Sequence, residues 1–225
     1  SLNGIDIESV RSVIESSDNG YLQPKQVEQI LDAAGIPRAE EIVTSDETIL
    51  CQRADEVGFP LVMKVVGPIH KTDVGGVSLN IGNQDLLLKE FKRMSKIAGY
   101  QAVMIQPMLS GLELFAGATY EPDYGHVVMC GLGGIYVEAL RDISTGLAPL
   151  SNVEASSMIR SLNSYSLLKG IRGEKGIDIQ KYADIIVRLS TVLRYATEIK
   201  ELDLNPLMAT DDKVVVVDAR VRIEK

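Results

Sequence analysis

The chain has 225 residues, 45% of them hydrophobic, so it is long enough to bury a large core in one domain or two lobes. Its formal net charge is −8 and it has no run rich in lysine or arginine, which argues against general nucleic-acid binding. No stretch is long and apolar enough for a transmembrane helix, residues 1–20 are too polar for a signal peptide, and Cys51 and Cys130 lack metal-ligand spacing, so we expect a protein of a reducing cytoplasm.

The chain begins with alternating helices and strands. Apolar residues at helical spacing predict a helix over residues 5–17. A second helix is expected from Gln23 to Ala34, because Pro24 suits a first turn and Gly35 is a typical stop. Residues 41–43 are a brief strand candidate.

Two further helices flank the central stretch. Thr44, followed three residues later by Glu47, is typical of a capping box, and the helix that it opens is expected to run to Gly58. Asn83 is a good N-cap for a helix that Gly99 closes. Residues 1–99 therefore hold small α/β units with no repeat and no low-complexity linker.

The central stretch is predicted to be a hairpin with a functional loop. Two apolar, β-branched runs, Leu61–Val66 and Val77–Ile81, flank a loop that contains Gly75 and Gly76. Period-two alternation puts Lys64 on the face opposite its apolar neighbours, so its ammonium needs solvent or a fixed anion. A nucleotide phosphate would supply that anion, and the glycine pair would let backbone N–H groups approach it. A solvent-facing lysine and an ordinary turn remain the alternative.

The next two strands are expected at residues 102–108 and 112–119. Gln106 and Met108 lie where two such halves would join, and a crevice between lobes often holds a planar ligand such as adenine. A core strand that ends in a turn explains the same residues. Glu113 is a charged residue in an apolar strand, as Lys64 is.

A glycine-rich turn follows the apolar strand that begins at His126. The spacing in Gly131–Gly134 lacks the dinucleotide fingerprint, so we reject NAD binding. Glu138, Arg141 and Asp142 form a possible polar cluster, with a solvated helix face as the alternative. His126 has no partner visible in the sequence and is interpreted as structural.

Residues 153–195 are predicted to be mostly helical. The interruption at Lys169–Gly173 carries two cations between glycines, which could meet phosphate. The last helix has one apolar stripe that we expect in the core, made of Tyr182, Ile186, Leu189 and Leu193.

The C-terminal strands predict a metal site. The two strands are Leu202–Met208 and Val214–Asp218. If Asp211–Asp212 is the turn, Asn205 faces Asp218 and Asp203 faces Arg220, all on one face. An amide oxygen beside a carboxylate suits Mg²⁺, which usually takes one or two protein ligands. A solvated hairpin is the alternative.

The whole chain resembles the ATP-grasp domain of the nucleoside-diphosphate-forming acyl-CoA synthetases. The similarity is to the β subunit of ADP-forming acetyl-CoA synthetase and, more distantly, to succinyl-CoA synthetase β. The motifs that carry it are Phe59-Pro-Leu-Val-Met-Lys64, His70-Lys-Thr-Asp-Val-Gly-Gly-Val77, Gln106-Pro-Met108, Gly131-Leu-Gly-Gly-Ile-Tyr-Val-Glu138 and Leu202-Asp-Leu-Asn-Pro-Leu207.

The resemblance implies an α/β (α+β) fold of two lobes with the nucleotide between them. Residues 21–106 would form the small lid lobe with the Lys64 hairpin, and residues 107–225 the large lobe with the metal hairpin. Residues 1–20 would be an N-terminal helix packed on the large lobe.

The resemblance also implies roles for the candidate residues. The nucleotide, ATP or ADP, would contact Lys64, Gly75, Gly76, Gln106, Met108 and Glu113. Asn205 and Asp218 would hold Mg²⁺, and the position of His70 is the one that accepts a phosphoryl group in the acetyl-CoA branch. Asp203 would orient that imidazole. Without the resemblance, His70 is an ordinary loop histidine.

The implied reaction is acyl-CoA + ADP + phosphate ⇌ acid + CoA + ATP, with His70 relaying a phosphoryl group to ADP. The chain has neither a CoA-binding domain nor a ligase domain, so an α subunit or the rest of a fused polypeptide must supply them, as expected for a hetero-oligomer. Ser1 in place of an initiator methionine suggests processing or excision from a longer chain.

The sequence departs from the family at two positions, and two alternative functions also fit it. Gly146 stands where the family often has arginine, and Leu112 where a basic residue is common, which puts substrate-side or subunit-contact details in doubt. The chain could instead be the nucleotide-binding regulatory module of a multidomain protein acyltransferase, without phosphoryl transfer. It could also be a carboxylate ligase that works through an acyl phosphate, which would leave His70 without a role.

Overall fold

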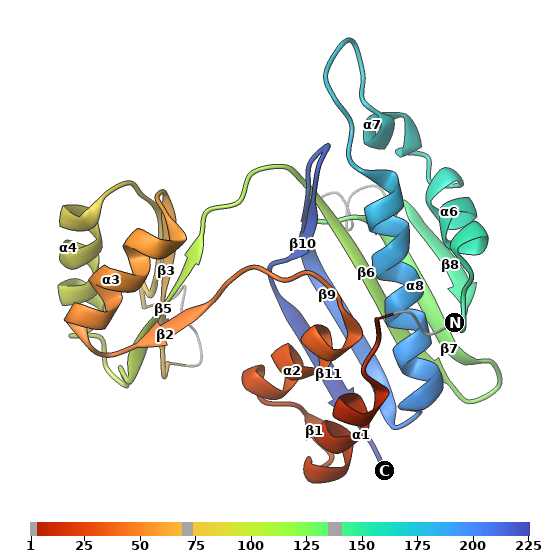
Figure 1. The fold of residues 1–225 in the computed structure, drawn as a ribbon, viewed down its shortest axis with the longest axis horizontal. Helices are drawn as coiled ribbons and strands as arrows, with labels where there is room; N and C mark the ends of the chain where they lie inside the picture. The colour runs from red at the N-terminus through yellow and green to blue at the C-terminus, as the bar shows by residue number, and fades with distance from the viewer. Residues whose placement is uncertain (1–3, 69–73, 135–140) are drawn as a thin grey trace. The chain divides into compact units, whose positions relative to one another are not determined.

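The chain folds into two units. The computed structural model describes residues 4–68, 74–134 and 141–225 (Figure 1). The small unit is Ala39–Leu109, and the large unit joins residues 1–38 to residues 110–225. Each unit has its own hydrophobic core and its own sheet, so each is described by itself.

The small unit is an antiparallel sheet with two helices packed on one face. Within its described residues the sheet has four strands in the order β2-β5-β3-β4. Leu61, Met63 and Val65 of the central strand point into a core that both helices share. The elements are β2 (Ile42–Thr44), α3 (Glu47–Val57), β3 (Leu61–Val66), β4 (Val77–Ile81), α4 (Gln84–Met94) and β5 (Ala102–Pro107).

The large unit is built on a second antiparallel sheet. Its described residues form seven strands in the order β1-β11-β9-β6-β7-β8, with β10 paired to β9 (Figure 1). The strands are β1 (Gly20–Tyr21), β6 (Leu112–Glu121), β7 (Gly125–Leu132), β8 (Ile143–Leu147), β9 (Ile199–Ala209), β10 (Val214–Val216) and β11 (Ala219–Ile223). The helices are α1 (Ile7–Ser16), α2 (Pro24–Ala34), α6 (Asn152–Arg160), α7 (Tyr165–Lys169) and α8 (Ile179–Tyr195).

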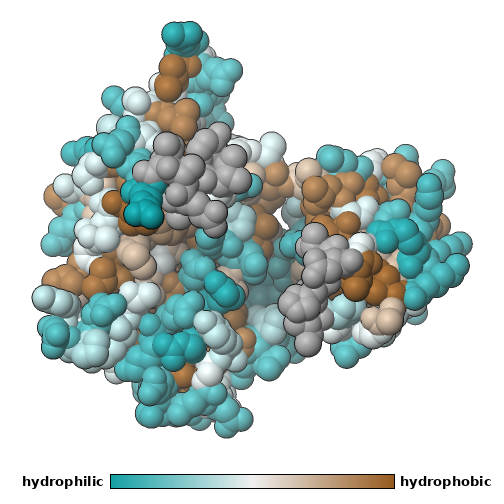
Figure 2. Space-filling model, turned by 180° about the vertical axis from the view of Figure 1, so that it is seen from behind, coloured by the Kyte–Doolittle hydropathy of each residue, from teal (hydrophilic) through white to brown (hydrophobic). Residues whose placement is uncertain are grey.

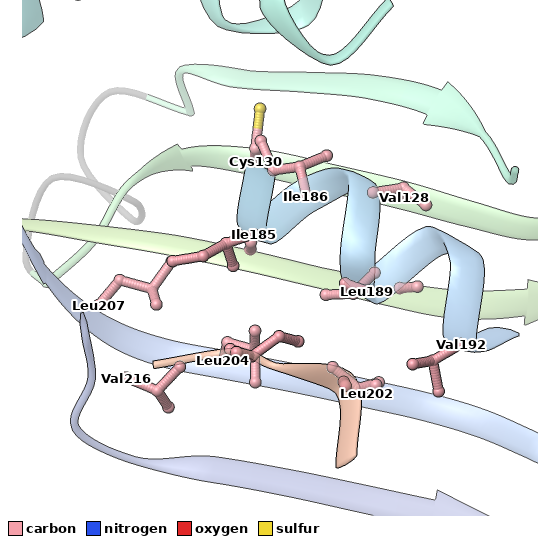
Figure 3. Close-up of a cluster of buried hydrophobic side chains, with 14 of the residues drawn as sticks. Val128, Cys130, Ile185, Ile186, Leu189, Val192, Leu202, Leu204, Leu207 and Val216 are labelled. Carbon is pink, nitrogen blue, oxygen red and sulfur yellow. The ribbon is translucent and has the colours of Figure 1, made fainter. Parts of the chain in front are cut away.

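Helix α8 covers the inner face of this sheet. Its predicted stripe of Tyr182, Ile186, Leu189 and Leu193 is buried, as expected. Figure 3 shows side chains of α8 directed at Leu202, Leu204 and Leu207 of β9. Because Leu202 and Leu204 are both buried in this way, Asp203 between them must face the other side of the sheet.

Two predicted helix ends are corrected by the capping geometry. Thr44 ends β2 instead of capping α3, and its Oγ1 accepts a hydrogen bond from the Asp46 N–H. Asp46 is the N-cap, because its carboxylate accepts from the Ile49 N–H. Helix α4 begins after the Asn83 cap as predicted but ends at Met94, before Gly99.

Helix α2 and Met108 lie outside the units to which the sequence assigned them. The small unit begins at residue 39 instead of 21, because Val27, Ile30 and Leu31 of α2 pack in the core of the large unit. Met108 lies in the small unit, and its backbone N–H donates to the Pro60 carbonyl there. Helix α1 lies in the large unit.

The surface carries no continuous apolar layer on the face drawn in Figure 2, where hydrophilic and hydrophobic residues alternate over short distances. Of the helices in the described part of the chain, none is both long and apolar enough to cross a membrane.

We expect Leu204→Ala to lower the free energy of unfolding of the large unit by about 2–5 kcal/mol, because it leaves a cavity under α8. Leu204 is fully buried, whereas Leu147 on β8 is 53% exposed. The same change at Leu147 should cost less than about 0.5 kcal/mol. Urea unfolding followed by circular dichroism measures both, and similar losses in the two variants would contradict the packing of β9 against α8.

Candidate active site

The β3–β4 hairpin presents Lys64 away from the core. Lys64 pairs with Val77, and the flanking Met63 and Val65 are fully buried on the opposite face. The Val65 N–H donates to the Gly76 carbonyl at 2.7 Å, which closes the hairpin just before the loop. The predicted alternation is confirmed, so the ammonium of Lys64 is held on the open face of the small sheet.

Helix α4 contacts the Gly75–Gly76 turn through the Arg93 side chain. The Arg93 guanidinium donates to the Gly75 carbonyl at 2.8 Å and to Glu90 Oε2 at 2.7 and 2.9 Å. The hydrogen bonds from Arg93 lower the pKa of Glu90, and a bond from Ser78 adds to the effect. Gly75 has φ of +67°, which favours glycine. The sequence analysis missed Arg93, although its spacing from Glu90 suits a helical ion pair.

His70 lies outside the described residues, in the segment between Pro68 and Val74. Its phosphoryl-accepting role therefore stays a prediction. The described ends of that segment are the β3 strand that carries Lys64 and the turn at Gly75.

The end of β5 carries the two residues predicted to line a base crevice. Gln106 is buried, and its Nε2 donates to Glu41 Oε1 at 2.6 Å. The Met108 sulfur accepts a hydrogen bond from the Asn80 N–H at 3.3 Å. Both side chains are thus fixed within the small unit, and their contact with a nucleotide base stays a prediction.

The C-terminal hairpin has the predicted register, but the predicted strand Val214–Asp218 ends at Val216, and Asp218 lies between β10 and β11. Asp203 pairs with Arg220, and the Asn205 N–H donates to the Asp218 carbonyl at 3.0 Å. Leu202 lies in the core, while Asn205 and Asp218 are exposed on the outer face.

The chemistry of this pair fits Mg²⁺. The Asn205 amide on β9 and the Asp218 carboxylate just before β11 offer hard oxygen ligands, and Mg²⁺ needs only one or two protein groups beside water and phosphate. Among the described residues no group of three or more His, Cys, Asp or Glu side chains is placed to hold a metal. Two protein oxygens would leave most of the Mg²⁺ octahedron to water and substrate phosphate.

A β-bulge lies next to Asn205. On β6, Leu114 pairs with Leu207 and Ala116 with Leu204, so Asn205 and Pro206 together face the single residue Phe115. Such bulges bend a strand and re-aim its side chains, and they are common beside active sites. The sequence analysis missed the bulge, although a proline inside a strand is a typical mark of one.

Asp203 occupies a half-buried position beside this pair. Its Oδ2 lies 3.5 Å from the Arg220 guanidinium. Burial raises the pKa of Asp203 above the ordinary 3.8, although the hydrogen bond from Arg220 works in the opposite direction. Gly117 of β6 lies against Asp203, where a Cβ atom would clash with the Leu202 carbonyl.

Glu113 lies against the glycine turn that follows β7. The Gly133 N–H donates to the Glu113 carbonyl at 2.8 Å, and a Cβ at Gly134 would collide with the Glu113 carboxylate. The predicted strand and turn are therefore packed together, with an exposed Glu113 side chain. Glu138 falls outside the described residues.

Three other residues that the sequence singled out make structural contacts. Asp142 is buried, and its carboxylate accepts from the Asn163 and Ser164 N–H groups at 2.8 Å, so it stabilises the turn before α7 instead of joining a polar cluster. His126 is buried with Nε2 2.6 Å from the Ile199 carbonyl, which confirms its structural interpretation. The Nζ of Lys169 lies over the Tyr165 ring.

Comparison with known proteins assigns the family. A family model described as an ATP-grasp domain matches residues 13–223. The chain belongs to the ATP-grasp domain family. Its ATP-grasp fold is therefore the one that the resemblance implied.

Among curated relatives, the β subunit of ADP-forming acetate–CoA ligase I of Pyrococcus furiosus is 38% identical, over 96% of this chain and 98% of that protein. The 4-hydroxybutyrate–CoA ligase (ADP-forming) of Nitrosopumilus maritimus is also 38% identical, but this chain spans only 29% of its length. This ATP-grasp chain thus corresponds to an entire subunit in one relative and to one part of a longer polypeptide in the other.

Among solved structures, the dinucleotide-forming acetyl-coenzyme A synthetase 1 of Ca. Korarchaeum cryptofilum has the same ATP-grasp fold. Its complex with coenzyme A and Mg-AMPPCP, with a phosphohistidine segment pointing towards the nucleotide-binding site, matches with a TM-score of 0.82 at 32% identity. The match covers 97% of this chain and 100% of that one.

We expect Asp203→Asn to raise the free energy of unfolding at pH 7. Because the pKa of Asp203 is raised in the folded state, the folded chain binds that proton more tightly than the unfolded chain. Stability therefore falls as the pH rises from 3.8 through the raised pKa, and the uncharged amide avoids this loss. The gain should vanish below pH 3.8. Urea unfolding of the wild type and the variant, at pH 7 and below pH 3.8, tests this.

Asp211→Asn is the matched control, because the hydrogen bond from Lys175 lowers the pKa of Asp211. That substitution should lower stability at pH 7 instead. A gain at Asp203 that is equal at both pH values would contradict the burial effect.

Proposed function

We propose that this chain is the ATP-grasp subunit or domain of an ADP-forming acyl-CoA synthetase. It would transfer a phosphoryl group between a phosphohistidine and ADP or ATP, within the reaction acyl-CoA + ADP + phosphate ⇌ acid + CoA + ATP. The observation that carries the proposal is the pairing of β9 with the last part of the chain, which brings Asp203, Asn205 and Asp218 near one another in a chain that matches a ligase β subunit over 96% of its length.

The proposed step forms one bond and breaks one. The P–N bond between phosphorus and the His70 imidazole breaks, and a bond from phosphorus to a terminal oxygen of ADP forms. The other ring nitrogen carries its N–H throughout, so the products are neutral imidazole and ATP. Lys64 would neutralise phosphate charge, while the backbone at Gly75 and Gly76 would approach the phosphate oxygens. Asp203 would accept a hydrogen bond from the imidazole and fix its orientation.

Mg²⁺ would be held by Asn205 and Asp218. When bound, the ion offsets the negative charge that builds up on the transferring phosphoryl group. Gln106, Met108 and Glu113 would complete the contacts of the nucleotide.

The CoA and acid chemistry would belong to a partner. The relatives that share this ATP-grasp portion are named as ligases or synthases of acetate, 4-hydroxybutyrate and trans-ferulate. Three such different acids alongside one shared portion support recognition of the acid elsewhere, on an α subunit or on fused CoA-binding and ligase domains. Such a partner would make the functional protein a hetero-oligomer or a longer chain, working in the cytoplasm.

The test is to incubate the chain with its CoA-binding and ligase portion, Mg²⁺ and γ-labelled ATP. We expect label on this chain that acid removes and base does not, and we expect His70→Ala to abolish it. The sequence has two histidines, so His126→Gln, at the buried histidine, is the control that should keep the label. Nucleotide binding without any label on the wild type would contradict the relay and favour a regulatory module or direct ligase.

We also expect Arg93→Ala to weaken ADP binding by about three- to ten-fold. The change removes the hydrogen bond that fixes the Gly75 carbonyl, so the backbone at Gly75 is less well positioned before the nucleotide binds. Lys92→Ala removes the same charge from the same helix and is the matched control. Isothermal titration with Mg²⁺ present measures both, and equal losses would show that α4 acts only through its charge.

A further inference from the structure

Tyr182 is a fully buried polar residue near the beginning of α8. Its hydroxyl lies 2.5 Å from the Phe115 carbonyl, 3.1 Å from the Gly131 nitrogen and 3.2 Å from the Gly131 carbonyl. A phenol has one proton, so it donates to Phe115 and accepts from the Gly131 N–H. The hydroxyl thus joins helix α8 to the backbones of β6 and β7 at one point.

Packing alone does not explain this hydroxyl. A phenylalanine ring would fill the same core volume without a polar group to satisfy, and burying a hydroxyl is unfavourable unless it is hydrogen-bonded. Burial raises the pKa of Tyr182 well above its ordinary value, so the group stays neutral and able to donate.

Two parts of the candidate site lie close in sequence to the backbone groups that the Tyr182 hydroxyl contacts. Glu113 lies two residues before Phe115 on β6, and Gly131 lies at the end of β7, directly before the glycine turn. The bond from the Gly133 N–H to the Glu113 carbonyl ties these two parts to each other. A shift of β6 against β7 at the Tyr182 hydroxyl would therefore move both.

The metal-binding bulge lies on the other side of β6 from the same point. Asn205 and Pro206 face Phe115, but neither offers β6 an N–H group there. Pro206 has none, and the Asn205 N–H donates to the Asp218 carbonyl. At Phe115 itself, β6 thus receives no N–H group from β9 and is held by β7 and by the Tyr182 hydroxyl, while Leu114 and Ala116 on either side remain paired with β9.

We propose that the Tyr182 hydroxyl is a positioning group for the metal and nucleotide site, which holds β6 so that Glu113, the glycine turn and the Asn205 bulge keep one arrangement. The proposal rests on the proposed function, since it assigns Tyr182 to that site. Tyr182 itself contacts neither metal nor nucleotide, and it acts through Phe115 and Gly131.

The test compares Tyr182→Phe with Ser190→Ala. Ser190 is also fully buried on α8, and its hydroxyl accepts a backbone hydrogen bond from the Leu150 N–H at 3.0 Å, away from the site. Both variants lose one buried hydroxyl and should unfold at a lower temperature than wild type. Only Tyr182→Phe should weaken binding of Mg²⁺-ADP, by about three- to ten-fold, the effect of one neutral hydrogen bond.

A double-mutant cycle with Asn205→Ala shows whether the effect passes through the bulge. Tyr182→Phe should weaken Mg²⁺-ADP binding markedly less in the Asn205→Ala background than in wild type. Wild-type affinity in Tyr182→Phe, or a loss that Ser190→Ala matches, would overturn the inference alone. A wild-type chain that binds no Mg²⁺-ADP would overturn the proposed function, and the inference with it.

Discussion

The burial of the leucines of β9 beneath α8 is the constraint on which the candidate site depends. Leu202, Leu204 and Leu207 are held in the core, so Asp203 faces the other side of the sheet. A slip of one residue would bury the carboxylate and expose the leucines, which makes the register strongly specified. The apolar core thus determines where the polar chemistry of this hairpin lies.

The bulge at Asn205 and Pro206 is a departure from this alternation. The buried positions on β9 run Leu202, Leu204, Leu207, so two residues instead of one separate the last pair. The extra residue leaves Asn205 exposed, with its N–H donating to the Asp218 carbonyl, while Leu204 and Leu207 on either side stay buried. The antiparallel pairing resumes on both sides of this bulge.

The parts of the fold that could be predicted from sequence are those that local rules specify. The turn at Asp211–Asp212 defined which residues of the last two strands face one another, and the helical spacing of the α8 stripe identified its core face. Helix α2 was assigned to the wrong unit, because its amphipathic pattern shows that one face is buried but not against which partner. Residues far away in the sequence determine which unit a helix packs against, so the local pattern does not reveal it.

The candidate site divides in the same way. Lys64 and the Asn205 pair follow from alternation within their own hairpins, so the sequence predicted them. Arg93 and Tyr182 act on residues 18 and 51 or more positions away, through the carbonyl of Gly75 and the backbones of Phe115 and Gly131. Tyr182 was correctly predicted as core, but its hydroxyl contacts depend on the register of two distant strands.

The acidic side chains of the large unit would make phosphate binding depend on a cation. Asp218 and Glu113 are exposed and Asp203 is half-buried on a chain whose net charge is −8, and such a surface repels phosphate. Arg220 offsets part of that charge, but at 3.5 Å from Asp203 it is already shared with a carboxylate. A divalent cation beside Asn205 and Asp218 would change repulsion into attraction. Lys64 is itself cationic and lies on the open face of its own sheet, so a phosphate beside it would need no such ion.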